Sequence, residues 1–228
     1  MWRIESPLDD AGAPYDRRAA VYDRLVRSRI YNRLAWGSSP DDYTRFAASA
    51  FAESEAPLLE VAAGSAAATA ELHASARRPT VLLDVSRPML ERAAKRIASA
   101  ADGHDVPENV RLVQADLFAI PPGLPRFTTI LGLGLTHLFD DLPGLVKALR
   151  RALLPGGHLH LAGLVTETRR GRRFLGILHR VGEAAAPLTA EELRGALGRP
   201  ASFSTTGCMA YATLDALQDP APIGSTPS

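Results

Sequence analysis

Several features that mark other protein classes are scarce in this chain of 228 residues. Its single cysteine, Cys208, excludes an intrachain disulfide, and we expect a reducing, cytoplasmic location. No apolar run approaches the length of a membrane span, and the first residues lack a signal-peptide pattern, so we expect neither feature. The formal net charge is only +1, and we therefore expect no nucleic-acid partner.

Metal-ligand patterns are also missing from the sequence. His158 and His160 alternate along a predicted strand, but no cysteine or acidic ligand set accompanies them, so we expect no metal site. The length suits one α/β domain, which we place at residues 1–217. Residues 218–228 are rich in proline, glycine and serine and are expected to be a flexible tail. The sequence leaves the oligomeric state undetermined.

The most informative stretch is residues 58–75, LLEVAAGSAAATAELHAS. Its apolar start reaches Glu60, small residues follow, and an alanine-rich helical segment comes next. This order predicts a buried strand, a tight turn and a helix packed closely against the strand. Small side chains at Ala62, Gly64 and Ala66 would let a ligand approach the backbone.

A second predicted strand, residues 80–83, leads into Asp84 about 20 residues further on, where dinucleotide-type folds place an acid for a ribose diol. Ser86 is a suitable cap for the helix that follows, and Pro88 is tolerated in its first turn. Alanine is abundant in this chain, so a turn that binds nothing would look similar to residues 62–66. The acid after the second strand favours a ligand site.

Two later stretches continue the alternation of strands and helices. Residues 110–114 predict a strand that ends in Ala115-Asp116-Leu117. A helix from Pro143 is predicted to end at Pro155-Gly156-Gly157, before a strand over residues 158–165. Residues 201–206 and 208–214 predict two more strands around Gly207.

Together, EVAAGSAAAT, LLDVSRPMLERAAKR, VRLVQADL and the Pro-Gly-Gly element resemble the ordered motifs of class I S-adenosylmethionine-dependent methyltransferases of the small-molecule type. The resemblance covers about residues 58–165. It implies a Rossmann-like, doubly wound α/β fold with a seven-stranded sheet whose last strand is antiparallel. It also implies an N-terminal helical lid, over residues 1–56, on a core of residues 57–217.

By this resemblance, the cofactor is S-adenosylmethionine, and the ribose hydroxyls would bind the two carboxylate oxygens of Asp84. The acid of the first strand would face the methionine end of the cofactor, or alternatively cap the following helix. Asp116 would accept a hydrogen bond from the adenine amino group, or alternatively be an ordinary turn acid. The implied cofactor contacts are Glu60, Ala62, Gly64, Asp84, Ser86, Met89, Asp116, Leu117 and Leu133.

The resemblance also points to residues on the acceptor side. Residues 129–135 predict a further strand, the fourth of the core, and His137 follows it. His137 is the best candidate for a general base, although a histidine in such a loop is also often a packing or capping residue. Tyr15, Tyr22, Tyr31 and Trp36 lie in the predicted lid and would line the acceptor pocket, or simply pack the lid onto the sheet.

The implied activity is methyl transfer from S-adenosylmethionine to a small-molecule acceptor, a reaction of the EC 2.1.1 type. Ala62 and Ala66 stand where the family usually has glycines, which motivates an alternative: a protein of this fold that binds S-adenosylmethionine or substrate and catalyses a non-methylating reaction such as cyclisation. A nicotinamide-dependent reductase is disfavoured because no tyrosine is followed four residues later by lysine and the glycine fingerprint is incomplete.

The most basic segment is residues 168–180, in which Arg169, Arg170, Arg172 and Arg173 accompany apolar residues. It is typical of a solvated amphipathic helix. Alternatively, it caps the site and meets an anionic acceptor, or it touches a membrane surface.

Overall fold

The structure, a computed structural model, describes residues 2–6, 40–103 and 105–216. Four predicted acceptor-pocket residues, Tyr15, Tyr22, Tyr31 and Trp36, lie outside these described residues, as does the predicted tail. The strands are β1 (Ile4–Glu5), β2 (Leu58–Val61), β3 (Thr80–Asp84), β4 (Val110–Gln114), β5 (Phe127–Gly132), β6 (Leu153–Leu164), β7 (Ser202–Thr206) and β8 (Met209–Asp215). The helices are α3 (Pro40–Ala52), α4 (Ala70–Ser75), α5 (Arg87–Ala100), the 3₁₀ turn η1 (Thr136–Leu138), α6 (Leu142–Arg150), α7 (Arg169–Arg180) and α8 (Ala190–Ala196).

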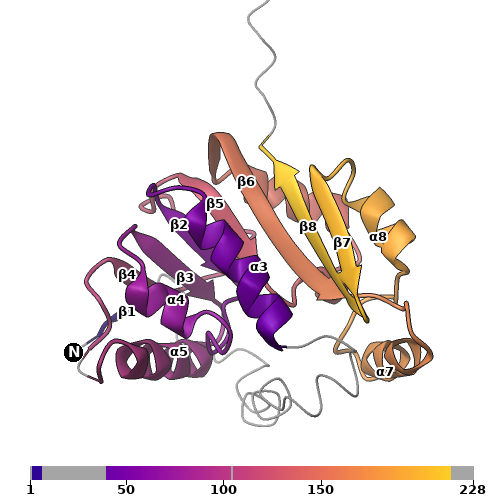
Figure 1. The fold of residues 1–228 in the computed structure, drawn as a ribbon, viewed down its shortest axis with the longest axis horizontal. Coiled ribbons are helices and arrows are strands. Elements are labelled where there is room, and N and C mark those ends of the chain that lie inside the picture. The colour runs from indigo at the N-terminus through magenta and orange to yellow at the C-terminus, as the bar shows by residue number, and fades with distance from the viewer. Residues whose placement is uncertain (1, 7–39, 104, 217–228) are drawn as a thin grey trace, which may run out of the picture.

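The described strands form one sheet in the order β1-β4-β3-β2-β5-β6-β8-β7 (Figure 1). Five neighbouring pairs from β1 to β6 are parallel, whereas β8 runs antiparallel to both of its neighbours. This order reverses at β2, as expected for a doubly wound α/β sheet. The predicted Rossmann-like fold class and its antiparallel strand are therefore confirmed.

The sheet has one strand more than the predicted seven. The additional strand, β1, pairs in parallel with β4 through Ile4 and Glu5. Arg111 on β4 reinforces this edge by donating from Nε and Nη2 to the two carboxylate oxygens of Glu5, at 2.9 and 2.8 Å. A strand of two residues shows no alternation, so the hydrophobic pattern gave no sign of it.

Helices cover both faces of the sheet (Figure 1). The helices α3, α4 and α5 pack on one face, where apolar residues such as Leu82 and Leu131 meet them. The helices α6 and α8 pack on the other face, over Leu59, Ile130 and Leu161. Both faces of the central strands are buried, which explains their nearly continuous apolar sequence.

One buried arginine fixes α3 to the sheet. The guanidinium of Arg78, which is 3% exposed, donates to the carbonyl oxygens of Ala50, Phe51 and Ala56 at the end of α3 and just beyond it. It also donates to the hydroxyl of Thr129 on β5, at 3.1 Å. A cation at a helix C-terminus meets carbonyl groups that lack partners within the helix, so this contact ends α3 and orients it.

The Pro-Gly-Gly element differs from its prediction. The helix α6 already ends at Arg150, and residues 155–157 lie within β6. There, Phe127 pairs with Leu153 and Thr129 with His158, so β6 contains three more residues than β5 between these pairs. A bulge in β6 accommodates these three additional residues.

None of the helices among the described residues has the length and apolar character of a membrane-spanning segment.

Candidate functional site

The loop after β2 has three residues in the left-handed backbone region. Their φ angles are +48° at Ala62, +53° at Gly64 and +51° at Ala66. Glycine adopts this region freely, whereas alanine adopts it at an energetic cost. The chain thus keeps the backbone shape of a loop with three glycines, although two of the three positions carry a methyl group.

Asp84 ends β3 directly beside this loop. Its Oδ2 accepts a hydrogen bond from the backbone N–H of Gly64 at 2.7 Å, and its Oδ1 accepts one from the N–H of Ser86 at 2.8 Å. The residue is 8% exposed. The two backbone donors therefore hold the carboxylate in a fixed orientation at the end of β3.

The space over Gly64 is open. A Cβ atom added to this residue would meet nothing within 4 Å, apart from its chain neighbours. The adjacent residue, Ser65, is held from the α5 side, because Arg96 donates to its carbonyl oxygen at 2.7 Å and to its hydroxyl. The loop is therefore fixed by two neighbouring elements and still presents open backbone at its tip.

Glu60, the acid that the sequence placed against the cofactor, makes its described contacts within the protein. Its Oε2 lies 2.6 Å from Nε2 of His73, and its Oε1 accepts a hydrogen bond from the hydroxyl of Thr69 at 3.1 Å. Nδ1 of His73 lies 3.1 Å from the hydroxyl of Thr80. All four residues are at most 2% exposed. These contacts tie Glu60 to α4 through side chains, whereas the predicted alternative, a helix cap by Glu60, is not formed because α4 has no side-chain cap hydrogen bond. A cofactor contact by Glu60 stays a prediction.

The predicted adenine contacts follow the end of β4. Asp116 is exposed, and its Oδ1 accepts a hydrogen bond from the N–H of Phe118 at 2.9 Å. Leu117 is buried in the core that lies under α6. The backbone N–H of Ala115 donates to the carbonyl oxygen of Asp84 at 3.1 Å, so the ends of β3 and β4 are tied together.

Ser86 and Met89 lie at the start of α5. Ser86 is the cap predicted from the sequence, because its hydroxyl accepts a hydrogen bond from the N–H of Met89 at 3.4 Å. Both residues are buried, at 1% and 8% exposure. The structure therefore brings Gly64, Asp84 and Ser86 together through direct hydrogen bonds and places Met89 next to them.

His137 lies in η1, beyond the end of β5 and beside the end of β6. Its Nδ1 accepts a hydrogen bond from the backbone N–H of Leu164 at 3.4 Å. Burial lowers the pKa of His137 to about 4, so the ring is neutral at pH 7. In this tautomer Nε2 carries the remaining proton. A neutral ring of such low pKa is a weak proton acceptor, and its role as a general base stays a prediction.

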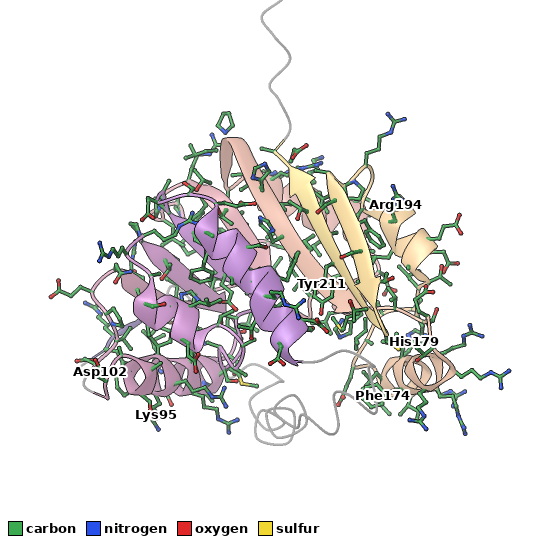
Figure 2. The ribbon with its side chains drawn as sticks, in the orientation of Figure 1. Lys95, Asp102, Phe174, His179, Arg194 and Tyr211 are labelled. Atoms are coloured by element: carbon green, nitrogen blue, oxygen red, sulfur yellow. The ribbon has the colours of Figure 1, made fainter. Side chains whose placement is uncertain are left out.

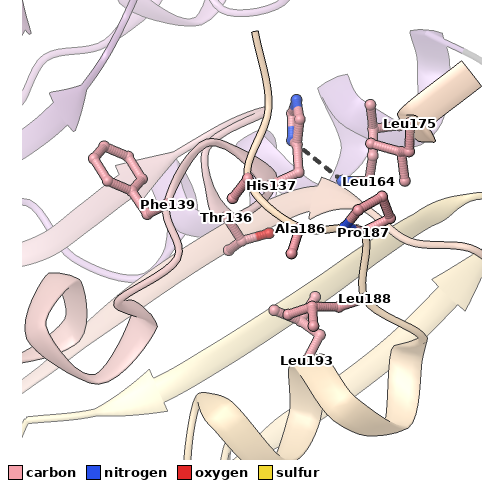
Figure 3. Close-up of a pocket in the computed structure, with 10 residues that line it drawn as sticks. Thr136, His137, Phe139, Leu164, Leu175, Ala186, Pro187, Leu188 and Leu193 are labelled. Atoms are coloured by element: carbon pink, nitrogen blue, oxygen red, sulfur yellow. Dashed lines mark hydrogen bonds between the residues drawn. The ribbon is translucent and has the colours of Figure 1, made fainter. Parts of the chain in front are cut away.

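A small hollow lies next to His137 (Figure 3). Its volume is only about 10 Å³ for the centre of a water-sized sphere, which is room for about one water molecule. The hydroxyl of Thr136 lines it and is buried without a hydrogen-bond partner in the described structure. A Cβ at residue 163 would lie 1.8 Å from this hydroxyl, so only glycine fits there. The lining residues are Thr136, His137, Phe139, Leu164, Leu175, Ala185, Ala186, Pro187, Leu188 and Leu193.

An aromatic cluster on the α3 face was not predicted as part of a site. The ring of Tyr211 on β8 lies 5.0 Å from that of Phe46 and 6.0 Å from that of Tyr43, measured between centroids. Leu133, predicted from the sequence, packs against the same cluster. The Tyr211 hydroxyl, close to α3 in Figure 2, is buried without a hydrogen-bond partner, and burial raises its pKa. Sequence patterns could not reveal the cluster, because its members come from α3 and β8.

The comparison with protein families matches residues 59–159 to a family described as a methyltransferase domain. This span contains the loop after β2 as well as Asp84, Asp116 and His137. A comparison with curated proteins found no match.

Several solved structures share the fold. A putative methyltransferase from Bacillus halodurans is 23% identical, with 72% of this chain and 69% of that chain covered and a TM-score of 0.55. The DhpI complex with SAH is 22% identical to this chain and has a TM-score of 0.58. The match covers 87% of this chain and 91% of that chain. A third structure is geranyl diphosphate C-methyltransferase from Streptomyces coelicolor in complex with Mg²⁺, geranyl diphosphate and S-adenosyl-L-homocysteine. It is 11% identical and has a TM-score of 0.63, and the match covers 92% of this chain and 100% of that chain. At these identities the likeness establishes the fold.

Proposed function

Since the chain carries a methyltransferase domain of the class I fold, we propose that it binds S-adenosylmethionine and transfers its methyl group to a small-molecule acceptor. The observation that carries this proposal is the Asp84 carboxylate. It is oriented by the N–H groups of Gly64 and Ser86 at the edge where the parallel strands β2 and β3 end. Ligands bind at this edge in doubly wound folds, next to the point where the strand order reverses.

The residues present fit this cofactor. The two oxygens of Asp84 match the two hydroxyl donors of a ribose, and the open space over Gly64 leaves room for the sugar beside the loop. Asp116, exposed at the next strand end, presents a carboxylate oxygen suited to an adenine amino group. The cofactor supplies a methyl group that its sulfonium has already activated, so alignment of the acceptor and exclusion of water are the main tasks left to the protein.

The acceptor would lie beyond the end of β5, near His137 and near the aromatic cluster of Tyr43, Phe46 and Tyr211, against which Leu133 packs. These side chains offer apolar and aromatic surface, and the Tyr211 hydroxyl adds a donor that lacks a partner among the described residues. The low pKa of His137 favours an acceptor that reaches the site ionised or reacts without losing a proton beforehand.

A non-methylating reaction such as cyclisation is the second candidate, and the two loop alanines motivated it. Their left-handed φ angles argue against a closed loop, because the backbone keeps the shape that glycines would give it. The loop shape therefore supports cofactor binding, and the turnover assay below separates the two reactions.

Turnover assays separate the two candidates. Purified protein is incubated with S-adenosylmethionine and a panel of phenols, carboxylic acids, amines and prenyl diphosphates, and release of S-adenosylhomocysteine is measured. We expect release that depends on one acceptor class and is lost in Asp84→Ala. Binding of S-adenosylmethionine by the wild type, without release for any class in the panel, would instead favour the non-methylating alternative. NADH and NADPH serve as controls, and no oxidation of either is expected.

A further inference from the structure

The helix α7 presents an unusual face to solvent. Residues at four-residue spacing share one side of a helix, and Arg169, Arg173, Ile177 and Val181 form such a row along α7 and its end. Ile177 is 53% exposed and Val181 is 57% exposed. The buried residues Gly171 and Leu175 occupy the opposite side. The outward row therefore combines arginines in its first half with large aliphatic side chains in its second half.

The charge of α7 is unfavourable for the isolated helix. It contains five arginines and no acidic residue, and three of them, Arg169, Arg170 and Arg172, lie within its first four residues. Positive charge near a helix N-terminus opposes the macrodipole, and Arg169 and Arg173 repel each other at a spacing of four residues. Within the described part of the chain, no ion pair involves Arg169, Arg172, Arg173 or Arg180. Such violations of local helix preference are typical of functional surfaces.

The exposed large apolar side chains lie beyond the carboxyl ends of the parallel strands. Among the described residues, the exposed large hydrophobic side chains are Phe118, Ile177 and Val181. Phe118 follows the end of β4, and α7 follows the end of β6, so both belong to the edge that holds the proposed site. Figure 2 shows nitrogen-tipped side chains standing out from the outer side of α7, away from the sheet.

We propose that α7 docks this edge of the protein onto an anionic lipid surface, with its arginines at the phosphate headgroups and Ile177 and Val181 at the boundary with the acyl chains. Basic residues next to exposed aliphatic side chains are typical of segments that bind an anionic membrane interface, and α7 presents both along its outward row. These arginines do not line the hollow next to His137, because the α7 residue that lines it is Leu175. An arrangement in which the basic and the apolar side chains both face outward fits a surface rather than a small enclosed anion.

Vesicle co-sedimentation of the full chain tests the proposal. Wild-type protein is mixed with vesicles of phosphatidylcholine alone or of phosphatidylcholine with phosphatidylglycerol. We expect binding only to the anionic vesicles, weakening as salt is raised. The triple variant Arg169→Gln, Arg172→Gln and Arg173→Gln should bind about 100-fold more weakly, at about fivefold for each arginine. The double variant Ile177→Ser and Val181→Ser should lose about tenfold.

A matched control removes the same charge from the opposite edge of the sheet. Arg77, Lys147 and Arg151 are exposed and lie before β3 or near the start of β6. Their triple replacement by glutamine should change vesicle binding by less than about threefold, because these charges lie beyond a Debye length from the docked edge. Equal losses in the two triple variants, or no binding of the wild type to anionic vesicles, would overturn the proposal. The melting temperature should not fall below that of the wild type in any of the three variants, and it should rise slightly in the α7 arginine variant, because that variant removes unfavourable charge from the start of the helix. Binding of S-adenosylmethionine should match the wild type in all three, so a failure of docking is distinguishable from a failure of the proposed function.

Discussion

Glycine at residue 62 should stabilise the protein, whereas glycine at the neighbouring residue 63 should destabilise it. Ala62 has a φ of +48°, and a left-handed conformation costs an L-residue about 1–2 kcal/mol. Ala62→Gly removes this cost but adds about 0.4–1 kcal/mol of chain entropy to the unfolded state. The expected net gain is about 0.5–1 kcal/mol, which corresponds to a rise in Tm of about 1–4 °C for a domain of this size.

The two other alanines act as internal controls. Ala66 shares the positive φ, but it is 2% exposed, so glycine there also loses a buried methyl worth about 0.8 kcal/mol and the net change should be close to zero. Ala63 is 9% exposed, and its φ is outside the left-handed region. Ala63→Gly therefore loses the methyl contact and gains unfolded-state entropy, at a cost of about 1–2 kcal/mol.

Urea denaturation of the three variants, with the change in unfolding free energy as the readout, tests this order. The expected ranking of stability is Ala62→Gly above wild type, Ala66→Gly near wild type and Ala63→Gly below it. If Ala62→Gly is destabilised as much as Ala63→Gly, the loop does not have the backbone shape described above. The inference that alanines preserve a glycine-type loop would then be refuted.

Three further predictions concern Arg78, His73 and His137. Arg78→Met should lower the free energy of unfolding by about 3–5 kcal/mol, because the guanidinium bonds buried carbonyl and hydroxyl groups, whereas Met at the exposed neighbour Arg77 should change it by less than about 0.5 kcal/mol. His73→Leu should cost about 3–5 kcal/mol in the same urea experiment, because it leaves the buried Glu60 carboxylate without its partner; a loss below about 1 kcal/mol would contradict the buried pair. Burial lowers the pKa of His137 to about 4, so folding favours the neutral ring, and stability should fall by roughly 1 kcal/mol per pH unit as the pH drops from about 6.5 toward 4. His137→Gln should flatten this part of the pH dependence of the unfolding free energy, and an unchanged slope would show that the ring is not buried in the folded state.

The sequence predicted the parts of the fold that rest on local patterns. Each parallel core strand, the cap at Ser86 and the antiparallel pair around Gly207 have clear apolar or turn signals, and all are present in the structure. The resemblance to class I methyltransferases is confirmed by the family match to residues 59–159 and by the fold. The placement of Asp84 beside Gly64 was also predictable, because the ends of parallel strands meet at one edge.

Contacts between distant segments could not be predicted in the same way. Arg96 lies on a helix face that looks solvated in the sequence, yet it reaches back to Ser65. The contacts of Glu60 with His73 and Thr69 were not predicted, because no periodic pattern pairs an acid with a histidine thirteen residues away. The Pro-Gly-Gly sequence is typical of a helix end, but here it lies in a bulge inside β6. The bulge forms because β5 pairs with β6 on both sides of it.

The central claim is that Asp84 and the loop after β2 hold S-adenosylmethionine, and calorimetric titration tests it most directly. Wild-type protein should bind S-adenosylmethionine saturably, with no binding of NADH or NADPH. Asp84→Ala should weaken binding about 100-fold, since two hydrogen bonds to a charged group are lost at about 1.5 kcal/mol each. Asp102→Asn removes a charge from an exposed loop and should leave affinity unchanged. Wild-type protein that binds no S-adenosylmethionine, or an Asp84→Ala variant that folds and binds as tightly as the wild type, would contradict the account.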